Sequence, residues 1–145
     1  MPTPPPKIVI DTQIVMDWLV FGDARVAPLA AAIEAGRARW IGREAMLAEL
    51  RHVLGRGVAA AWLPDLGRIE HTFATHCQMV AAEPAPAVRL KCRDPDDQQF
   101  IDLALAEQAA WLLSRDKAVL ALRKRALTLG LSIATPETWI RQLTA

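Results

Sequence analysis

The sequence has few cysteines, no long apolar run and no excess of charge of one sign. Its two cysteines, Cys77 and Cys92, lie in no paired spacing such as C-x-x-C, so a disulfide framework, a zinc ribbon and a thioredoxin-type site all lack support. No uninterrupted apolar run approaches the roughly 20 residues of a membrane span, and residues 1–6 contain no apolar segment of a signal peptide. We therefore expect a soluble, cytoplasmic protein without a membrane partner.

The charges nearly balance. Lys and Arg together number 17 and Asp and Glu number 16, which gives a net charge of +1. This balance is too even to indicate nucleic-acid binding by bulk electrostatics, so any basic surface must be local. With 145 residues, of which 52% are hydrophobic, the chain suits one domain that buries about 70% of its unfolded surface. We expect a disordered proline-rich leader over residues 1–6 and a single domain over residues 7–145.

Strand-like and helix-period segments alternate along the chain, which favours an α/β fold over a helix bundle or an all-β sandwich. Short apolar runs predict strands over residues 8–10, 39–41, 78–80, 111–113 and 132–133. The spacing of apolar residues predicts helices over residues 26–35, 46–54, 65–77, 94–109, 117–129 and 138–143. A connection that contains prolines is expected over residues 83–93. The alternation predicts a central, mostly parallel sheet of about four to five strands with helices on both faces.

Four acidic residues stand at the end of a predicted strand or on a predicted helix. Asp11 follows the strand at residues 8–10, Asp116 comes shortly after the strand at residues 111–113, and Glu49 and Asp97 belong to helices. If the strands are parallel neighbours, the carboxylates converge on one rim of the sheet, where open α/β folds place their ligands. A cluster of like charges at this rim needs a cation.

Each of these acids also has a structural explanation. An Asp at a strand end often caps the helix that follows, which applies to Asp11 and Asp116. Glu49 lies beside the apolar stripe of its helix, where a solvated Glu is the commonest case. Only the set as a whole indicates a site.

The segment Asp94-Pro95-Asp96-Asp97 offers three carboxylates within four residues. Asp94 suits a helix cap, Pro95 suits the first helical position, and acids in the first turn complement the helix dipole. Asp97 shares a helical face with Phe100, so it is expected to point toward the sheet edge. The sequence alone does not separate Asp96 from Asp97 as a ligand.

Taken in order, four segments are similar to the motifs of one family. Val9-Ile10-Asp11-Thr12-Gln13 resembles an opening strand motif in which Asp is followed by Thr and Asn, and the stretch from Ala48 to Arg56 resembles a second, acidic helix. Residues 94–100 resemble a third segment, and Ser114-Arg115-Asp116 a last one that is normally Thr-Gly-Asp. The family is the PIN domain family of metal-dependent ribonucleases, and within it the PIN toxins of toxin–antitoxin systems. The resemblance covers residue 7 to about residue 139.

The resemblance implies a three-layer PIN-like fold and an endoribonuclease that hydrolyses phosphodiester bonds of single-stranded RNA, leaving a 5′-phosphate and a 3′-hydroxyl. It implies Mg²⁺ or Mn²⁺ on Asp11, Asp97 and Asp116, with Glu49 as a ligand through water or as an orienter of the nucleophile. Such hard cations prefer oxygen ligands and lower the pKa of a bound water. Without metal, repulsion should raise the pKa of at least one carboxylate.

The toxin branch implies an antitoxin protein as partner. The apolar stripes at residues 47–54 and 66–73 offer a surface for an antitoxin helix or a homodimer, although both stripes are more simply explained as core-facing.

Two departures from the family pattern are visible. Gln13 stands where the family usually carries Asn, and Ser114-Arg115 replaces Thr-Gly. Thr12, Gln13 and Ser114 are expected to support the carboxylates, because a longer amide and a retained hydroxyl can still form hydrogen bonds. Arg115 could bind phosphate or compete with a metal for Asp116.

Local cations near the acidic segments are candidates for contacts with RNA phosphates. These candidates are Arg93, Arg115 and Lys117. Phosphate contacts of this kind make RNA affinity depend on salt concentration.

Two other functions stay open. A PIN fold that no longer cuts would serve as an RNA-binding or protein-binding module, because function belongs to the site and not to the fold. Retention of all four acids argues against this alternative. A phosphatase or phosphoacceptor domain also places Asp at strand ends, but its haloacid-dehalogenase form would need a second Asp where this chain has Gln13, and its receiver form would need a Lys on a late strand.

Overall fold

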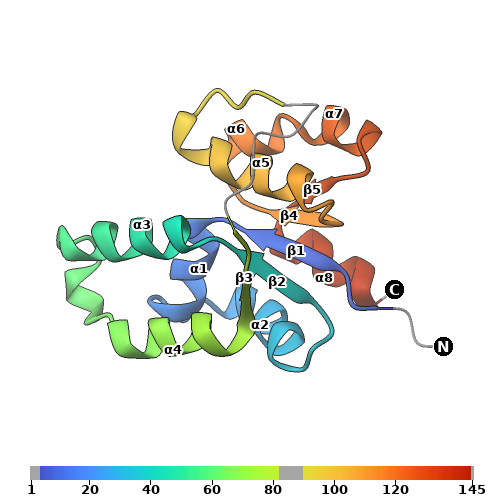
Figure 1. Cartoon of the computed structure of the whole chain (residues 1–145). Helices are drawn as coiled ribbons and strands as arrows, with labels where there is room; N and C mark the ends of the chain where they lie inside the picture. The colour runs from blue at the N-terminus through green and yellow to red at the C-terminus, as the bar shows by residue number, and fades with distance from the viewer. Residues whose placement is uncertain (1–3, 82–89, 145) are drawn as a thin grey trace.

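A computed structural model describes residues 4–81 and 90–144 as a parallel sheet between two helical layers (Figure 1). The five strands are β1 (Lys7–Ile10), β2 (Arg39–Gly42), β3 (Cys77–Met79), β4 (Trp111–Leu113) and β5 (Ser132–Ala134). They pair in parallel throughout, in the order β3-β2-β1-β4-β5. The predicted α/β fold with a parallel sheet of four to five strands is confirmed.

The helices alternate with the strands as predicted, but the helix at residues 12–19 was not among those expected from the spacing of apolar residues. The α-helices are α1 (Thr12–Leu19), α2 (Ala27–Glu34), α3 (Glu44–Gly55), α4 (Leu66–His76), α5 (Gln98–Ala106), α6 (Lys117–Leu120), α7 (Arg123–Thr128) and α8 (Pro136–Thr144). Short 3-10 helices lie at η1 (Ala24–Val26), η2 (Ala60–Trp62) and η3 (Pro95–Asp97). Among the described residues no helix is both long enough and apolar enough to cross a membrane.

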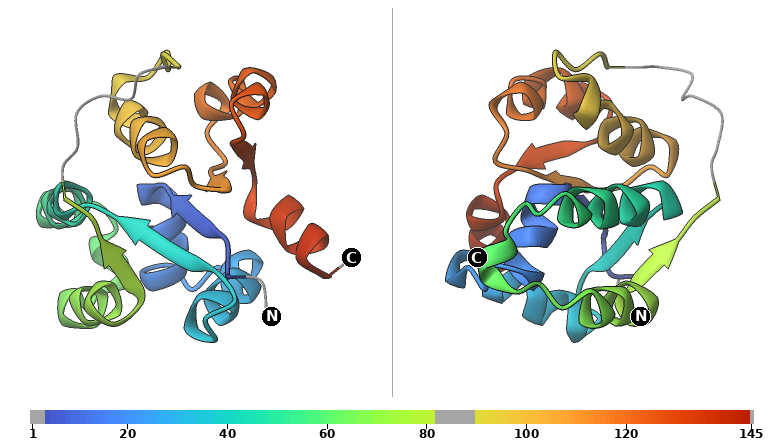
Figure 2. Two further views of the ribbon diagram at one scale, coloured as in Figure 1. Left: turned by 45° about the vertical axis from the view of Figure 1, so that its right-hand side comes forward. Right: turned by 90° about the vertical axis from the view of Figure 1, so that its left-hand side faces the viewer.

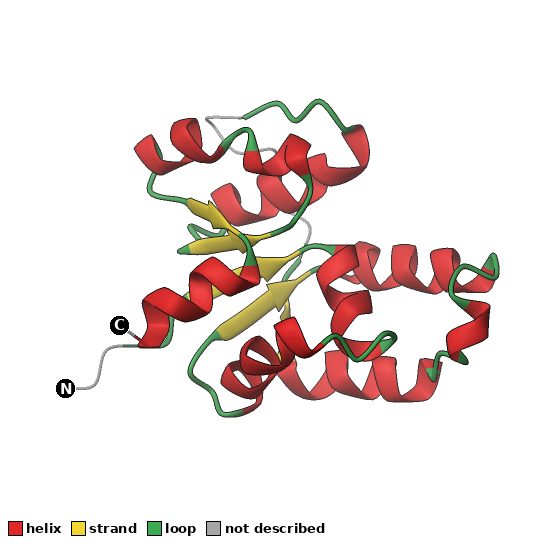
Figure 3. Ribbon diagram, turned by 180° about the vertical axis from the view of Figure 1, so that it is seen from behind, coloured by secondary structure: helices red, strands yellow, loops and turns green. Residues whose placement is uncertain are grey.

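Two hydrophobic clusters cover the two faces of the sheet. One joins β1 and β2 to α1, α2, α3, α4 and α8, and the other joins β1 and β4 to α5, α6 and α7. Figures 2 and 3 show the strands between these layers. β1 illustrates the arrangement, because Ile8 and Ile10 belong to the first cluster while Val9 belongs to the second. A strand that is buried on both faces needs the continuous apolar run seen here.

The strand order places a crevice at the centre of the sheet. The chain begins at β1, adds β2 and β3 on one side, and then returns to add β4 and β5 on the other. The carboxyl ends of β1 and β4 are therefore neighbours at the point where the strand order reverses, and the Asp11 amide donates to the Leu113 carbonyl at 3.3 Å. Open α/β sheets bind ligands at this place.

Several predicted boundaries are wrong. The helix expected over residues 94–109 begins with η3 and ends at Ala106, because Gln108 adopts a left-handed conformation (φ 52°) without the glycine that usually marks such an end. The helix expected over residues 117–129 is two helices, since the Leu122 amide bonds to the Val119 carbonyl (3.0 Å) in a tighter turn. No Gly or Pro marks this break.

The apolar stripes at residues 47–54 and 66–73 are mostly core. Leu50, Ile69 and Phe73 are buried against the sheet, whereas Leu66, the first residue of the second stripe, is 42% exposed. The reading of these stripes as core-facing is the one that the packing supports.

Two predictions fall partly on residues outside the described ranges, namely residues 1–3 of the expected leader and residues 82–89 of the expected connection. Within the described part of the leader, the Pro6 carbonyl accepts a hydrogen bond from the Arg39 amide (2.8 Å).

Candidate metal centre

A cavity of about 270 Å³ opens where the strands end, between the N-termini of α1 and α5 and the middle of α3. The acids predicted from the sequence all line it. Its lining residues are Asp11, Thr12, Gln13, Glu49, Asp97, Phe100, Arg115 and Asp116. The topology thus brings together four carboxylates from four separate segments of the chain.

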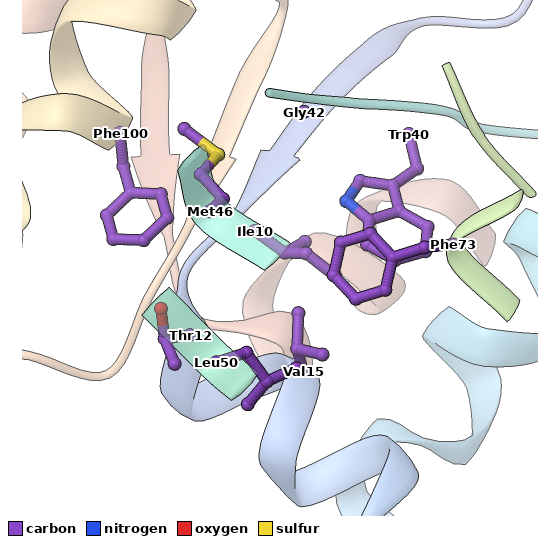
Figure 4. A pocket seen from close by; sticks show the side chains of 9 residues that line it. All are labelled: Ile10, Thr12, Val15, Trp40, Gly42, Met46, Leu50, Phe73 and Phe100. Carbon is purple, nitrogen blue, oxygen red and sulfur yellow. The ribbon is translucent and has the colours of Figure 1, made fainter. Parts of the chain in front are cut away.

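A smaller apolar hollow lies behind this cavity (Figure 4). Its volume is about 10 Å³, which is room for one water at most. Thr12 and Phe100 line both spaces. Trp40 and Phe73 also line the hollow, and their ring centroids lie 4.7 Å apart. The hollow is part of the packed core that fixes the floor of the acidic cavity.

Asp11 is held firmly at the end of β1. Its carboxylate caps α1 by accepting from the Ile14 amide (2.9 Å), and it also accepts from the hydroxyl of Ser114. Only 4% of Asp11 is exposed, and this burial raises the pKa of its carboxyl above the ordinary value, although both hydrogen bonds lower it. The predicted capping role and the position in the site are therefore compatible.

Asp97 forms a compact group with Asp94 and Asp116. One carboxylate oxygen from each lies within 4.8 Å of the other two. Asp97 Oδ2 is buried and has no hydrogen-bond partner among the residues that the structure describes. Burial, followed by the charges of Asp116 and Asp94, raises the pKa of Asp97 to about 7. Repulsion was the expected cause of a raised pKa, and it contributes, but burial is the larger cause.

The other two members of this group serve also as helix caps. Asp94 accepts from the Asp96 amide (3.0 Å) at the start of η3, and Asp116 accepts from the Ala118 amide (2.8 Å) at the start of α6. Sequence reasoning favoured Asp94 as a cap and kept it only in reserve as a ligand. Its spacing of three residues from Asp97, which puts both on one side of a helical turn, was the signal for its second position. Asp96 is exposed and does not line the cavity, so the geometry favours Asp97.

Glu49 faces the cavity from α3, outside the compact group. Gln99, in the first turn of α5, donates to its carboxylate through Nε2. This contact joins the two helices that flank the cavity and fixes the Glu49 carboxylate. Glu49 is thus placed to act on a molecule inside the cavity more than to complete the three-carboxylate group.

The predicted supporting residues take different positions. Ser114 is fully buried, and besides donating to Asp11 it accepts from the Asp116 amide (3.0 Å). Thr12 and Gln13 line the cavity, but Gln13 donates to Asp17 (2.9 Å) and not to one of the predicted ligands. Of these three described residues, Ser114 is the one that connects two acids of the site.

The predicted phosphate contacts are only partly brought together. Arg115 lines the acidic cavity, where it forms ion pairs with Asp17 and Glu137. Arg93 lines a separate cavity beside η3, and Lys117 is exposed at the start of α6 without lining either space.

The donor set fits a divalent metal. It consists of carboxylate oxygens, which Mg²⁺ and Mn²⁺ prefer, and it contains a buried oxygen of Asp97 without a partner among the described residues. A cation placed among these carboxylates would relieve the repulsion that raises the pKa of Asp97.

Comparison with known proteins agrees with this geometry. A family model described as PIN domain matches residues 7–118, which run from the first residue of β1 into α6 and include every acid of the cavity. A search of curated proteins found no match.

Proposed function

The chain belongs to the PIN domain family, and from this premise we propose that it is a metal-dependent endoribonuclease that hydrolyses phosphodiester bonds of single-stranded RNA. PIN domains are typically metal-dependent nucleases and generally act on RNA. The observation that carries the proposal is the buried oxygen of Asp97, which has no partner within residues 4–81 and 90–144 and lies in a group of three carboxylates. Such a group is unfavourable without a cation.

In this proposal Asp94, Asp97 and Asp116 hold Mg²⁺ or Mn²⁺, with Asp11 beside them. When bound, the cation supplies an activated water and positive charge opposite the phosphodiester oxygens. Ser114 keeps the Asp11 carboxylate oriented through its buried hydroxyl. This arrangement leaves the open side of the cavity to the RNA strand.

Glu49 takes the role of orienter of the nucleophile. Its carboxylate faces the cavity from the helix opposite the acidic group, and Gln99 holds it in place. A carboxylate that is fixed near an attacking water can accept its proton and direct its lone pair. Arg115 lines the cavity, whereas Lys117 and Arg93 lie outside it, and all three are proposed as phosphate contacts.

The experiment that tests the activity is cleavage of a labelled single-stranded RNA at fixed low salt. The unaltered chain and Asp11→Asn are compared with Mn²⁺, with Mg²⁺ and with EDTA. We expect cleavage by the unaltered chain that requires metal and is lost in the variant. Absence of cleavage of several RNA sequences by folded, metal-loaded protein would instead favour the alternative, a PIN domain that binds RNA or protein without cutting.

We further propose that the nuclease is the toxin of a toxin–antitoxin pair and acts in the cytoplasm. The support is the similarity of four segments, in order, to the motifs of PIN toxins. Induced expression in a bacterial host should then arrest growth, and expression of Asp97→Asn at the same level should not. Equal growth of both cultures would remove the toxin role and leave the nuclease proposal in place.

A further inference from the structure

Arg115 brings a cation to the wall of the acidic cavity, directly before Asp116. Both terminal nitrogens of its guanidinium bind acids outside the metal group. Nη1 donates to Asp17 Oδ2 at 2.5 Å, and Nη2 donates to Glu137 at the start of α8. These two acids therefore fix where the charge of Arg115 lies.

Gln13 and Arg115 both donate hydrogen bonds to the carboxylate of Asp17. Gln13 Nε2 donates to Asp17 Oδ1 (2.9 Å), while Arg115 occupies Oδ2. Asp17 lies one turn after Gln13 on α1 and is 7% exposed. Two of the positions at which the chain departs from the family pattern, Gln13 and Arg115, are thus joined through one buried residue.

The pairing of Arg115 with Asp17 and Glu137 matters because a guanidinium at this place can compete with a metal for carboxylates. A guanidinium binds carboxylates in a two-pronged geometry, and here several carboxylates line the same cavity. An Arg115 side chain paired with Asp116 would occupy carboxylate oxygens that a divalent cation needs. The observed pairing with Asp17 and Glu137 keeps those oxygens free of the guanidinium.

We propose that Asp17 is a positioning residue of the metal centre, which holds the Arg115 guanidinium on its own carboxylate so that Asp116 stays available to the cation. The proposal rests on the metal site of the proposed function. Gln13 contributes by orienting Asp17, and Glu137 holds the second nitrogen of Arg115 from α8, which lies beyond the residues that the family model matches.

The test is a double-mutant cycle on Mn²⁺ binding, measured by titration at fixed pH and ionic strength. The cycle compares the unaltered chain, Asp17→Asn, Arg115→Gln and the double variant. Asp17→Asn should raise the Kd for Mn²⁺ about fivefold, a coupling typical of neighbouring charged groups, because the released guanidinium competes with the metal. In the Arg115→Gln background the same substitution should have no effect, since no guanidinium remains to be released.

Glu137→Gln provides a second variant if Asp17→Asn folds poorly. It frees the other nitrogen of Arg115 at a half-buried position, and it should raise the Kd in the same direction, again only while Arg115 is present. An equal loss of Mn²⁺ affinity with and without Arg115, or no loss from either substitution, would overturn the positioning role.

The two proposals fail differently in these measurements. If the cycle shows the coupling but no RNA is cut, the positioning role stands and the nuclease proposal falls. If RNA cleavage requires metal but the cycle shows no coupling, the reverse holds. An unaltered chain that binds no Mn²⁺ contradicts both.

Discussion

The buried hydroxyl of Ser114 donates to the Asp11 carboxylate and thereby joins the ends of two neighbouring strands, β4 and β1. The same oxygen accepts from the Asp116 amide (3.0 Å). One small side chain thus sets the relative position of two acids that are far apart in the sequence, Asp11 and Asp116. The resemblance predicted a hydroxyl here, and the structure gives its physical reason.

Replacing Ser114 by Ala should therefore weaken both stability and metal binding. The buried Asp11 would lose a donor, and a hydrogen bond to a charged group contributes about 1.5–3 kcal/mol. We expect the free energy of unfolding, measured with urea, to fall by about 2 kcal/mol, together with a weaker affinity for Mn²⁺. Ser114→Thr keeps the hydroxyl and is the control, which should retain most of the metal affinity. Equal metal affinity in the Ala and Thr variants would contradict this role for the hydroxyl.

Asp96 and Asp97 provide a matched pair of substitutions. Each replacement by Asn removes one negative charge from the same short segment, but only Asp97 lines the cavity. Asp97→Asn should reduce the rate of RNA cleavage by at least about 100-fold, as expected when a group that holds the reacting centre is lost, and Asp96→Asn by less than about threefold. Initial rates at saturating Mn²⁺ measure both. A larger effect of Asp96→Asn would mean that the ligand has been assigned to the wrong neighbour.

The raised pKa of Asp97 predicts that the stability of the metal-free chain depends on pH. This pKa rises from 3.8 to about 7 in the folded chain, so between these values the folded state binds more protons than the unfolded state. The free energy of unfolding should therefore fall, through this group, as the pH rises through that window. Asn does not ionise, so Asp97→Asn should become more stable relative to the unaltered chain as the pH increases. Urea unfolding in EDTA, from about pH 4 to about pH 8, measures this difference, and a constant difference across the range would be inconsistent with the raised pKa.

The fold was largely predictable from the sequence, because its signals are local. The run Ile8-Val9-Ile10 is buried on both faces, and the stripe that includes Leu29 and Ile33 packs as expected. The break after α6 was not predictable, since it depends on one tighter hydrogen bond in a segment without Gly or Pro.

The sequence was enough to predict which carboxylates converge on the candidate site. It was not enough to predict which contacts hold them in place. Asp94 lies in the same group as Asp97, and its spacing of three residues from Asp97 is visible in the sequence. The pairing of Arg115 with Asp17 joins residues 98 positions apart, and no local pattern in either segment signals it. Such contacts depend on how helices pack against the sheet, which periodicity does not fix.

Gly42 lies at the end of β2, beside the apolar hollow, where the packing leaves little room for a side chain (Figure 4). A Cβ added here would lie 2.9 Å from Cys77 Sγ on the neighbouring strand β3. Overpacking of this kind destabilises by about 1–3 kcal/mol, so Gly42→Ala should lower the free energy of unfolding by that amount. The loss should be smaller when Gly42→Ala is made in a Cys77→Ala background, where the sulfur is absent. Urea unfolding of the four chains tests this coupling, and additive effects would show that the sulfur is not the obstacle.

The most direct test of the metal centre is the anomalous scattering of Mn²⁺ in crystals of the unaltered chain. The account predicts a peak in the acidic cavity about 2 Å from carboxylate oxygens of Asp97 and Asp116, a distance typical of hard cations with oxygen ligands. The peak should be absent from crystals of Asp97→Asn grown under the same conditions. A peak elsewhere on the molecule, or none at saturating Mn²⁺, would contradict the assignment of these carboxylates as the metal site.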